Sequence, residues 1–283
     1  MSTNKSIHLE PMTLKEIQMV SLNILEHVHR FCVENDIQYS LAFGSLIGCI
    51  RHKGFIPWDD DLDIMMTRDN YEKFCKLYHD TDEYALITPK KRNAYIAYSR
   101  ICEMKRTCVV PKSPTHTIPT GVWIDIFVLY DVDNEEDKYY SKLDEIHKVA
   151  RQIYKLRMSK RPLVAIKGVK SKIRVLYQKL FWHTDILDLV DKHVSLCENF
   201  ANHSTSYYGN LGWCLKLPLA RKGRFPKSLF EKYELKDYAG SQFYAISGYD
   251  EFLRHYYGDY MQLPPAEKQV RGHTFHKYYW KKG

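Results

Sequence analysis

Signals of membrane insertion, secretion and covalent cross-linking are missing from this sequence of 283 residues. It has no run of about 18 apolar residues, the length that a membrane-spanning helix needs. The first residues, MSTNKSIHLE, have no apolar core of a secretion signal, so we expect the protein to stay in the cytosol. The 7 cysteines are odd in number and form no C-x-x-C pair, which argues against a disulfide framework and a zinc ribbon.

Acidic residues are missing from one long stretch. Between Ile146 and Thr184 there are 11 Lys or Arg and no Asp or Glu. The rest of the chain holds the other 31 of the 42 basic residues and all 34 acidic residues, so the excess of positive charge is local to this stretch. The stretch mixes these cations with apolar residues, the composition of a helix that lies on an anionic membrane surface. An ordinary basic helix packed on the domain is an equally good interpretation.

The most informative segment runs from Tyr39 to Met66, YSLAFGSLIGCIRHKGFIPWDDDLDIMM. Its apolar start, Tyr39 to Phe43, predicts a short strand that ends at Gly44-Ser45. A helix from Ser45 to Arg51 should follow, and a helix N-terminus beside a glycine is a ready site for phosphate. The segment therefore predicts a phosphate-binding turn.

Acidic residues lead directly into the next predicted strand. On a strand, Asp61 and Asp63 point to the same face with Cα atoms roughly 6 to 7 Å apart. Carboxylates so placed can share Mg²⁺ or Mn²⁺ together with a substrate's phosphates. Asp125 is the one charge inside the apolar strand Gly121 to Leu129, and we expect it to join this metal site. The alternatives are a solvated acidic turn and a buried Asp held by backbone N–H groups.

Further elements follow from periodicity and capping. Thr13 and Glu16 form a capping box for a helix that extends to Asn35. Helices are also predicted at 69–78, 134–159, 184–201 and 249–257, and strands at 84–88, 94–102 and 107–110. The final residues, RGHTFHKYYWKKG, show no packing pattern and are expected to be partly disordered.

These motifs resemble the LicD family of phosphotransferases, which have a nucleotidyltransferase fold and include the fukutin-related ribitol-phosphate transferases. The resemblance extends along most of the chain. It is strongest in RHKGFIPWDDDLDI together with the preceding Gly-Ser, in WIDIF at 123–127, and in YGDYMQLPP at 257–265. It implies an α+β fold: a nucleotidyltransferase-type mixed sheet with packed helices and a helical insertion.

The resemblance assigns roles to individual residues. Asp61, Asp63 and Asp125 would be the catalytic metal ligands for Mg²⁺ or Mn²⁺, and Asp125 could also accept a proton from the attacking hydroxyl. Gly44 and Ser45 would contact the diphosphate. The other substrate-binding candidates are Arg51, His52, Lys53, Trp58 and Arg100. For Arg51, His52 and Lys53 a solvated or structural role is as good an interpretation, and Trp58 could equally serve in packing.

We expect a transfer of phosphocholine from CDP-choline to a hydroxyl of a cell-surface glycan precursor, with release of CMP. The acceptor could be lipid-linked, and an anionic membrane surface on the inner face is a candidate partner. Choline is preferred over a polyol such as ribitol or glycerol because aromatic faces, with Trp58 first among them, select a trimethylammonium group. The other aromatic candidates are Tyr207, Tyr208, Trp213, Tyr256 and Tyr257.

Two other functions remain open. A nucleotidyltransferase would attack the α-phosphorus of a nucleoside triphosphate and release pyrophosphate. An RNA-binding module would use the basic stretch and the 22 tyrosines, although the Asp cluster would repel a phosphate backbone, so nucleic acid is not the expected partner.

The chain departs from the family pattern at two places. Tyr238-Ala239-Gly240 stands where many members have Phe-Glu-Gly, and Val128-Leu129-Tyr130 stands where Pro-Leu-Asp is frequent. Both departures leave the acids intact and concern donor or acceptor choice. We divide the chain into a catalytic core (1–133), a basic helical insertion (134–205) and a C-terminal segment that returns to the core (206–283).

Overall fold

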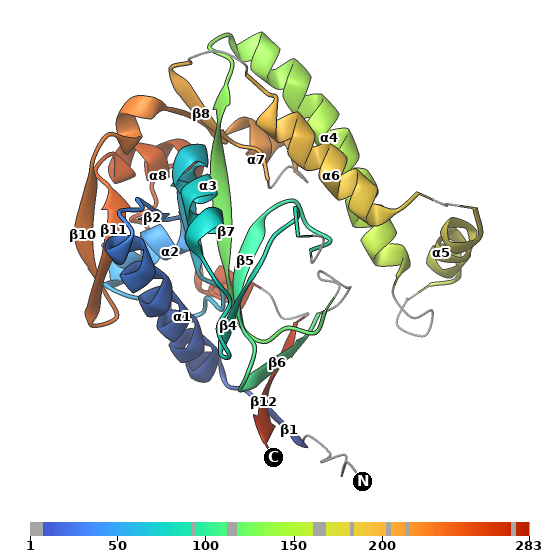
Figure 1. Cartoon of the computed structure of the whole chain (residues 1–283), viewed down its shortest axis with the longest axis horizontal. Helices are drawn as coiled ribbons and strands as arrows, with labels where there is room; N and C mark the ends of the chain where they lie inside the picture. Colours follow the sequence, from blue (N-terminus) through green and yellow to red (C-terminus); the bar gives the residue numbers. More distant parts are fainter. Residues whose placement is uncertain are drawn as a thin grey trace.

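The computed structural model describes residues 8–91, 94–111, 118–160, 168–181, 184–201, 205–212, 216–272 and 276–282. A mixed sheet lies at its centre, with helices around it, so the predicted α+β class is confirmed (Figure 1). The main sheet has the order β2-β3-β7-β5-β4, extended by β8 and β9 beside β7. Its strands are β2 (Ser40–Leu41), β3 (Asp63–Thr67), β7 (Trp123–Val132), β5 (Ser99–Glu103), β4 (Tyr84–Ile87), β8 (Tyr207–Asn210) and β9 (Arg224–Pro226).

The two innermost strands run in the same direction. β3 and β7 are parallel, whereas β5 pairs with β7 in the antiparallel sense. β7 is almost wholly apolar and buried, as expected for a central strand that is covered on both faces. The strand predicted at 94–102 begins only at Ser99, because the preceding residues do not pair with β7 beyond Ile126.

Helix α1 (Leu14–Glu34) packs its apolar stripe on this sheet. Thr13 caps it as predicted: its hydroxyl accepts the Glu16 N–H at 3.3 Å, and its own N–H donates to the Glu16 carboxylate at 2.7 Å. The fully buried stripe recurs at helical spacing and consists of Ile17, Val20, Ile24, Leu25 and Val28. Helix α3 (Arg68–Leu77) lies beside β3 and β7.

A helical layer follows β7 in the sequence. α4 (Glu136–Ser159) packs against α6 (Ile186–Glu198), while α5 (Val169–Phe181) contacts α4 and projects from the body of the molecule (Figure 1). The short α7 is Leu217–Arg221. No helix of the described segments is long and apolar enough to cross a membrane.

The C-terminal part returns to the core. It comprises a 3₁₀ turn (Lys227–Phe230), the hairpin β10 (Tyr233–Tyr238) and β11 (Ser241–Ile246), helix α8 (Tyr249–Tyr257) and a further 3₁₀ turn (Ala266–Lys268). The hairpin docks beside β2, where the Ile246 N–H donates to the Ser40 hydroxyl at 3.0 Å. Helix α8 has the predicted bounds.

The prediction of a disordered C-terminus was wrong for the residues that are described. β12 (Lys277–Lys282) is the middle strand of a second sheet, between β1 (His8–Pro11) and β6 (Thr107–Val110). The strand was missed because its partners come from distant parts of the chain, and its sequence, KYYWKK, lacks apolar and polar alternation.

Candidate active site

Asp63 and Asp125 lie side by side at the centre of the sheet. The two residues are paired in register on the parallel strands β3 and β7, and neighbouring strands are about 4.8 Å apart. β3 begins at Asp63, so Asp61 lies in the loop before it rather than on the strand. The alternation persists, because Leu62 is fully buried whereas Asp61 and Asp63 are half-buried. The sequence therefore places Asp61 and Asp63 on one face, and strand pairing puts Asp125 next to Asp63.

The Gly44-Ser45 turn leads into a helical segment that starts earlier than predicted. Helix α2 (Phe43–Ile47) continues into a π-helical turn (Gly48–His52). The residue with positive φ is Phe43, at 46°, a costly conformation for an aromatic residue. Its ring packs against those of Phe127 and Tyr256, and these contacts hold the strained backbone in place.

Gly44 and Ser45 each contact the acidic residues. The Ser45 hydroxyl is buried and accepts the Asp63 N–H at 2.8 Å, which ties the turn to the start of β3. A Cβ at Gly44 would lie 2.9 Å from a carboxylate oxygen of Asp59. Glycine therefore leaves room for this carboxylate, and the predicted contacts of both residues with a diphosphate stay predictions.

Arg100 is the cation of this site. It lies on β5 directly opposite Asp125, and its Nε donates to the Asp125 carboxylate at 2.5 Å. Its guanidinium also stacks 4.1 Å from the ring centroid of Trp123 and donates to the Tyr98 hydroxyl at 3.3 Å. Burial alone would lower the pKa of Arg100, but the Asp125 charge more than offsets this, so the side chain stays protonated. Arg100 thus fixes the orientation of Asp125.

The carboxylates crowd one another. Burial raises the pKa of Asp63 well above its usual value, and the negative charges of Asp61, Asp125 and Asp59, in that order, raise it further. Arg100 opposes this rise. Ionised carboxylates this close need more positive charge than one guanidinium supplies.

Hard divalent cations fit these oxygen ligands, and the expectation of Mg²⁺ or Mn²⁺ rests on that fit. Among the described residues, the acidic side chains whose ligand atoms all lie within 4.8 Å of one another are Asp59, Asp60 and Asp61. Asp60, however, is bound by Arg271 at 2.6 Å and is fully buried. Asp59, which the sequence analysis did not select, therefore joins the candidate ligands, and the set Asp61, Asp63 and Asp125 stays a prediction.

The remaining basic candidates lie at the end of the π-helical turn (Arg51 and His52) and directly after it (Lys53), and each has protein contacts. Arg51 donates to the backbone carbonyl groups of Tyr260 at 2.5 Å and Gln262 at 3.2 Å, which anchors the C-terminal segment. Lys53 is exposed, with φ of 56°. The ring of His52 lies edge-on to that of Trp58, with centroids 6.4 Å apart. Their substrate contacts stay predictions.

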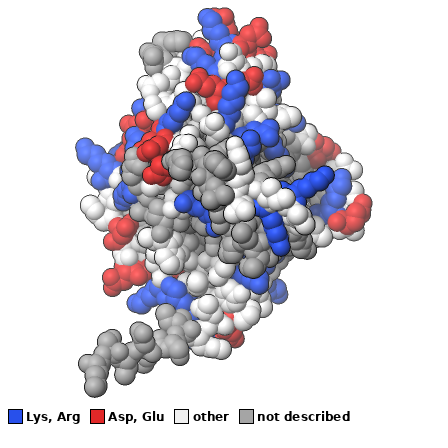
Figure 2. Space-filling view, turned by 90° about the vertical axis from the view of Figure 1, so that its right-hand side faces the viewer, with Lys and Arg blue, Asp and Glu red and all other residues white. Residues whose placement is uncertain are grey.

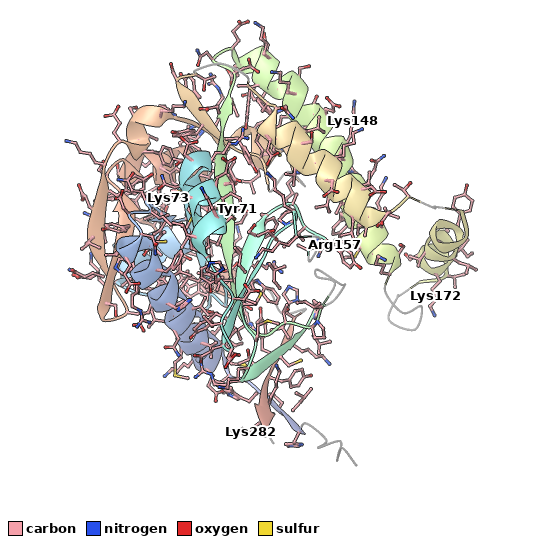
Figure 3. All side chains as sticks on the ribbon, in the orientation of Figure 1. Tyr71, Lys73, Lys148, Arg157, Lys172 and Lys282 are labelled. Atoms are coloured by element: carbon pink, nitrogen blue, oxygen red, sulfur yellow. The ribbon has the colours of Figure 1, made fainter. Side chains whose placement is uncertain are left out.

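Two tyrosines lie near the acids and a second arginine lies near Arg100; of the three, the sequence analysis selected only Tyr256 as a candidate. Tyr238 is fully buried, and its hydroxyl has no hydrogen-bond partner among the described residues. Burial and then the Asp63 charge raise the pKa of Tyr256 to about 12, so its hydroxyl stays protonated. Burial lowers the pKa of Arg157 to about 10, and the nearby Arg100 adds to this effect. Arg157 belongs to α4, so the helical insertion brings a cation toward the catalytic sheet (Figure 3).

The other aromatic candidates for a choline site are only partly available. The Arg224 guanidinium stacks 3.5 Å from the Tyr207 centroid, and the Lys227 ammonium lies 4.8 Å from that of Tyr208. Both rings therefore already face protein cations. Tyr257 remains 44% exposed next to the acids, while Trp213 lies outside the described residues.

Fold and site together define a nucleotidyltransferase-type domain. A family description, LicD/FKTN/FKRP nucleotidyltransferase domain, matches residues 36–167. The lipopolysaccharide cholinephosphotransferase LicD of Haemophilus influenzae is 33% identical over 95% of this chain and 99% of its own length. An uncharacterised protein of Rickettsia typhi is 40% identical over 18% of this chain and 17% of its own length. An uncharacterised protein of Rickettsia prowazekii is 44% identical over 14% of this chain and 15% of its own length. The chain belongs to the LicD family.

Proposed function

We propose that this protein transfers phosphocholine from CDP-choline to a hydroxyl group of a cell-envelope glycan and releases CMP. The observation that carries the proposal is the end-to-end similarity to a lipopolysaccharide cholinephosphotransferase, combined with the Asp63, Asp125 and Arg100 row on adjacent strands. An acidic site of this kind suits phosphoryl transfer, in which positioning and electrostatic stabilisation supply most of the catalysis.

The acceptor oxygen would attack the choline-bearing phosphorus, and the bond from this phosphorus to the oxygen of CMP would break. Asp125 is the proposed acceptor of the hydroxyl proton, and Arg100 holds it in place. Asp61, Asp63 and Asp125, with Asp59 nearby, would hold Mg²⁺ or Mn²⁺. Such a cation would neutralise charge on the phosphate oxygens.

Trp58 is the proposed aromatic wall for the trimethylammonium group. It is half-buried against the core beside His52, and it immediately precedes the acidic loop. A cation–π contact of this kind contributes about 0.5 to 2 kcal/mol. The neighbouring carboxylates would add to the attraction.

The acceptor is proposed to be a lipid-linked glycan precursor at the inner face of a membrane. The name of the Haemophilus relative supports a lipopolysaccharide-type acceptor. The protein would then act peripherally.

The product of the reaction tests this function. Purified protein is incubated with Mg²⁺, a glycolipid acceptor extract and either CDP-choline or a nucleoside triphosphate, and products are separated by ion-exchange chromatography. CMP released from CDP-choline, with choline phosphate on the acceptor, is the expected result. Asp63→Asn serves as the inactive control. Pyrophosphate release from the triphosphate without CMP formation would reject phosphocholine transfer in favour of nucleotidyl transfer.

A further inference from the structure

Helix α5 turns apolar side chains toward solvent. Val169, Ile173, Leu176 and Tyr177 are 73%, 61%, 47% and 57% exposed. Their spacing is that of a single helix face, where successive residues are rotated by about 100°. In an amphipathic helix packed on a domain, such a face would be the buried one. Here it is the outer one.

Lysines flank this face on both sides. At about 100° per residue, the four apolar side chains cover an arc of about 100°, with Lys170 beyond one edge and Lys172 beyond the other. Both lysines are exposed. Val175, on the opposite side of the helix, is only 7% exposed, and α5 contacts α4. The helix thus rests on the protein by one side and offers an apolar strip edged with ammonium groups on the other.

Cations continue onto the neighbouring helix. Lys148, Arg151 and Lys155 are exposed on α4, and Lys148 and Lys172 both extend away from the central sheet (Figure 3). Across the face that α5 presents, basic side chains lie over the middle of the view, whereas most acidic ones lie toward its rim (Figure 2). The first acid beyond the stretch is Asp185, whose carboxylate accepts the Leu187 N–H and caps α6.

We propose that α5 is a docking helix for an anionic membrane surface. Val169, Ile173 and Leu176 enter the boundary between headgroups and acyl chains, and Lys170 and Lys172 reach the lipid phosphates with their long side chains. Charge complementarity selects this partner, because 11 basic and no acidic residues occur from Ile146 to Thr184. Nucleic acid would leave the apolar strip in water, and a second copy of the chain would bring two basic faces together.

The biological purpose of this docking rests on the proposed function, since a lipid-linked acceptor would be met at the membrane. The docking itself needs no donor or acceptor. A binding measurement without substrates therefore separates the two proposals, and failure of one leaves the other standing.

The test is co-sedimentation of the full chain with vesicles of phosphatidylcholine alone or with about one-third phosphatidylglycerol. The unmodified protein should partition at least tenfold more strongly to the anionic vesicles, and salt should weaken the binding. Lys170→Gln with Lys172→Gln should reduce partitioning about 25-fold, since each cation near an anionic surface contributes about fivefold. The matched control is Lys15→Gln with Lys76→Gln, two exposed lysines on α1 and α3, which should change binding less than twofold.

The apolar strip is tested separately. Val169→Ser, Ile173→Ser and Leu176→Ser together should reduce binding to anionic vesicles tenfold or more, while Leu235→Ser, at a 48% exposed site on β10, should not. Unchanged thermal unfolding shows that these surface variants are folded.

Three results would overturn the proposal. One is equal binding to neutral and anionic vesicles, and another is full binding by the serine triple variant. The third has two parts: the unmodified protein does not bind vesicles but forms dimers or binds RNA, and the serine triple variant loses that dimerisation or RNA binding.

Discussion

Asp63 and Asp125 face each other across the parallel strands β3 and β7, and Arg100 lies opposite Asp125 on the other side. From β3 through β7 to β5, this row carries two acidic side chains followed by one basic side chain. Because the strands fix the spacing of these side chains, a substitution that removes the charge of any one of them should leave the backbone positions of the other two unchanged.

Replacing the acids should stop catalysis without unfolding the protein. Asp61→Asn, Asp63→Asn and Asp125→Asn should each lower kcat by at least about a hundredfold, because an amide is a neutral and weaker ligand for a divalent cation. Asp63→Asn should unfold at the same or higher urea concentration than the unmodified protein, since it removes a charge that burial and its neighbours disfavour. Kinetics and urea unfolding measure both effects.

The control for this series is removal of the metal. Activity should disappear in EDTA and return with Mg²⁺ or Mn²⁺. Full activity in EDTA contradicts the metal assignment, and full activity of one variant removes that residue from the site.

Asp60→Asn should behave differently from its neighbours. Asp60 is fully buried against Arg271, so losing its charge leaves the guanidinium without its ion-pair partner and should lower the free energy of unfolding by about 2 kcal/mol. At temperatures where it is folded, the variant should keep most of its kcat. Arg271→Met should show the same loss of stability, and a stable but inactive Asp60→Asn would instead make Asp60 a metal ligand.

Arg100→Lys should reduce turnover although it keeps the charge. Lysine cannot reproduce the fixed Nε contact with Asp125 together with the stacking on Trp123, so Asp125 loses its orientation. We expect kcat to fall about tenfold to a hundredfold. KM for CDP-choline should change less than kcat. A KM effect alone would indicate that Arg100 contacts the donor rather than positioning Asp125.

The donor preference depends on Trp58. In competition, CDP-choline should be consumed well ahead of CDP-ribitol and CDP-glycerol, and Trp58→Ala should erode that preference by about threefold to thirtyfold. Trp58→Phe should keep part of it, since a phenyl ring still presents a π face. An unmodified protein that prefers CDP-ribitol would reject choline while leaving the metal chemistry intact.

His193 makes stability depend on pH. It is buried on α6, and burial lowers its pKa to about 4. The unfolded chain, with a pKa near 6.5, therefore binds the proton more readily, so stability is full above pH 6.5 and falls as the pH drops toward 4. At pH 5 the loss should be about 2 kcal/mol. Urea unfolding at pH 7.5 and at pH 5 measures the difference in the free energy of unfolding between the two pH values. This difference should be smaller in His193→Leu than in the unmodified protein, and an unchanged difference would assign the pH dependence to other groups.

Local signals predicted most of the helices and the acidic motif. The capping box at Thr13 and the apolar period behind it were enough for α1, because the helix satisfies its own hydrogen bonds. Asp63 and Asp125 were selected because each is a charge at the start of or within an apolar strand. The prediction that Asp61 and Asp63 point to one face agrees with their half-burial on either side of the fully buried Leu62, although Asp61 lies before the strand and not on it.

Contacts between distant segments were out of reach of those signals. Nothing near Arg100 in the sequence indicates that it pairs with Asp125, because that contact depends on β5 lying beside β7. Asp59 and Asp60 are adjacent and chemically identical, yet one lies near the Gly44 turn and the other binds Arg271. The sorting of such neighbours is decided by tertiary structure alone.

The Asp60–Arg271 pair also has a consequence for how the protein is made. The two residues are 211 positions apart. At about 5 to 20 residues per second, the ribosome delivers the arginine on the order of 10 to 40 s after the aspartate. During that interval Asp60 lacks the ion pair with Arg271. The newly made enzyme therefore gains this stabilising ion pair only when nearly the whole polypeptide has emerged, and a nascent chain that stalls before Arg271 would have a lower free energy of unfolding.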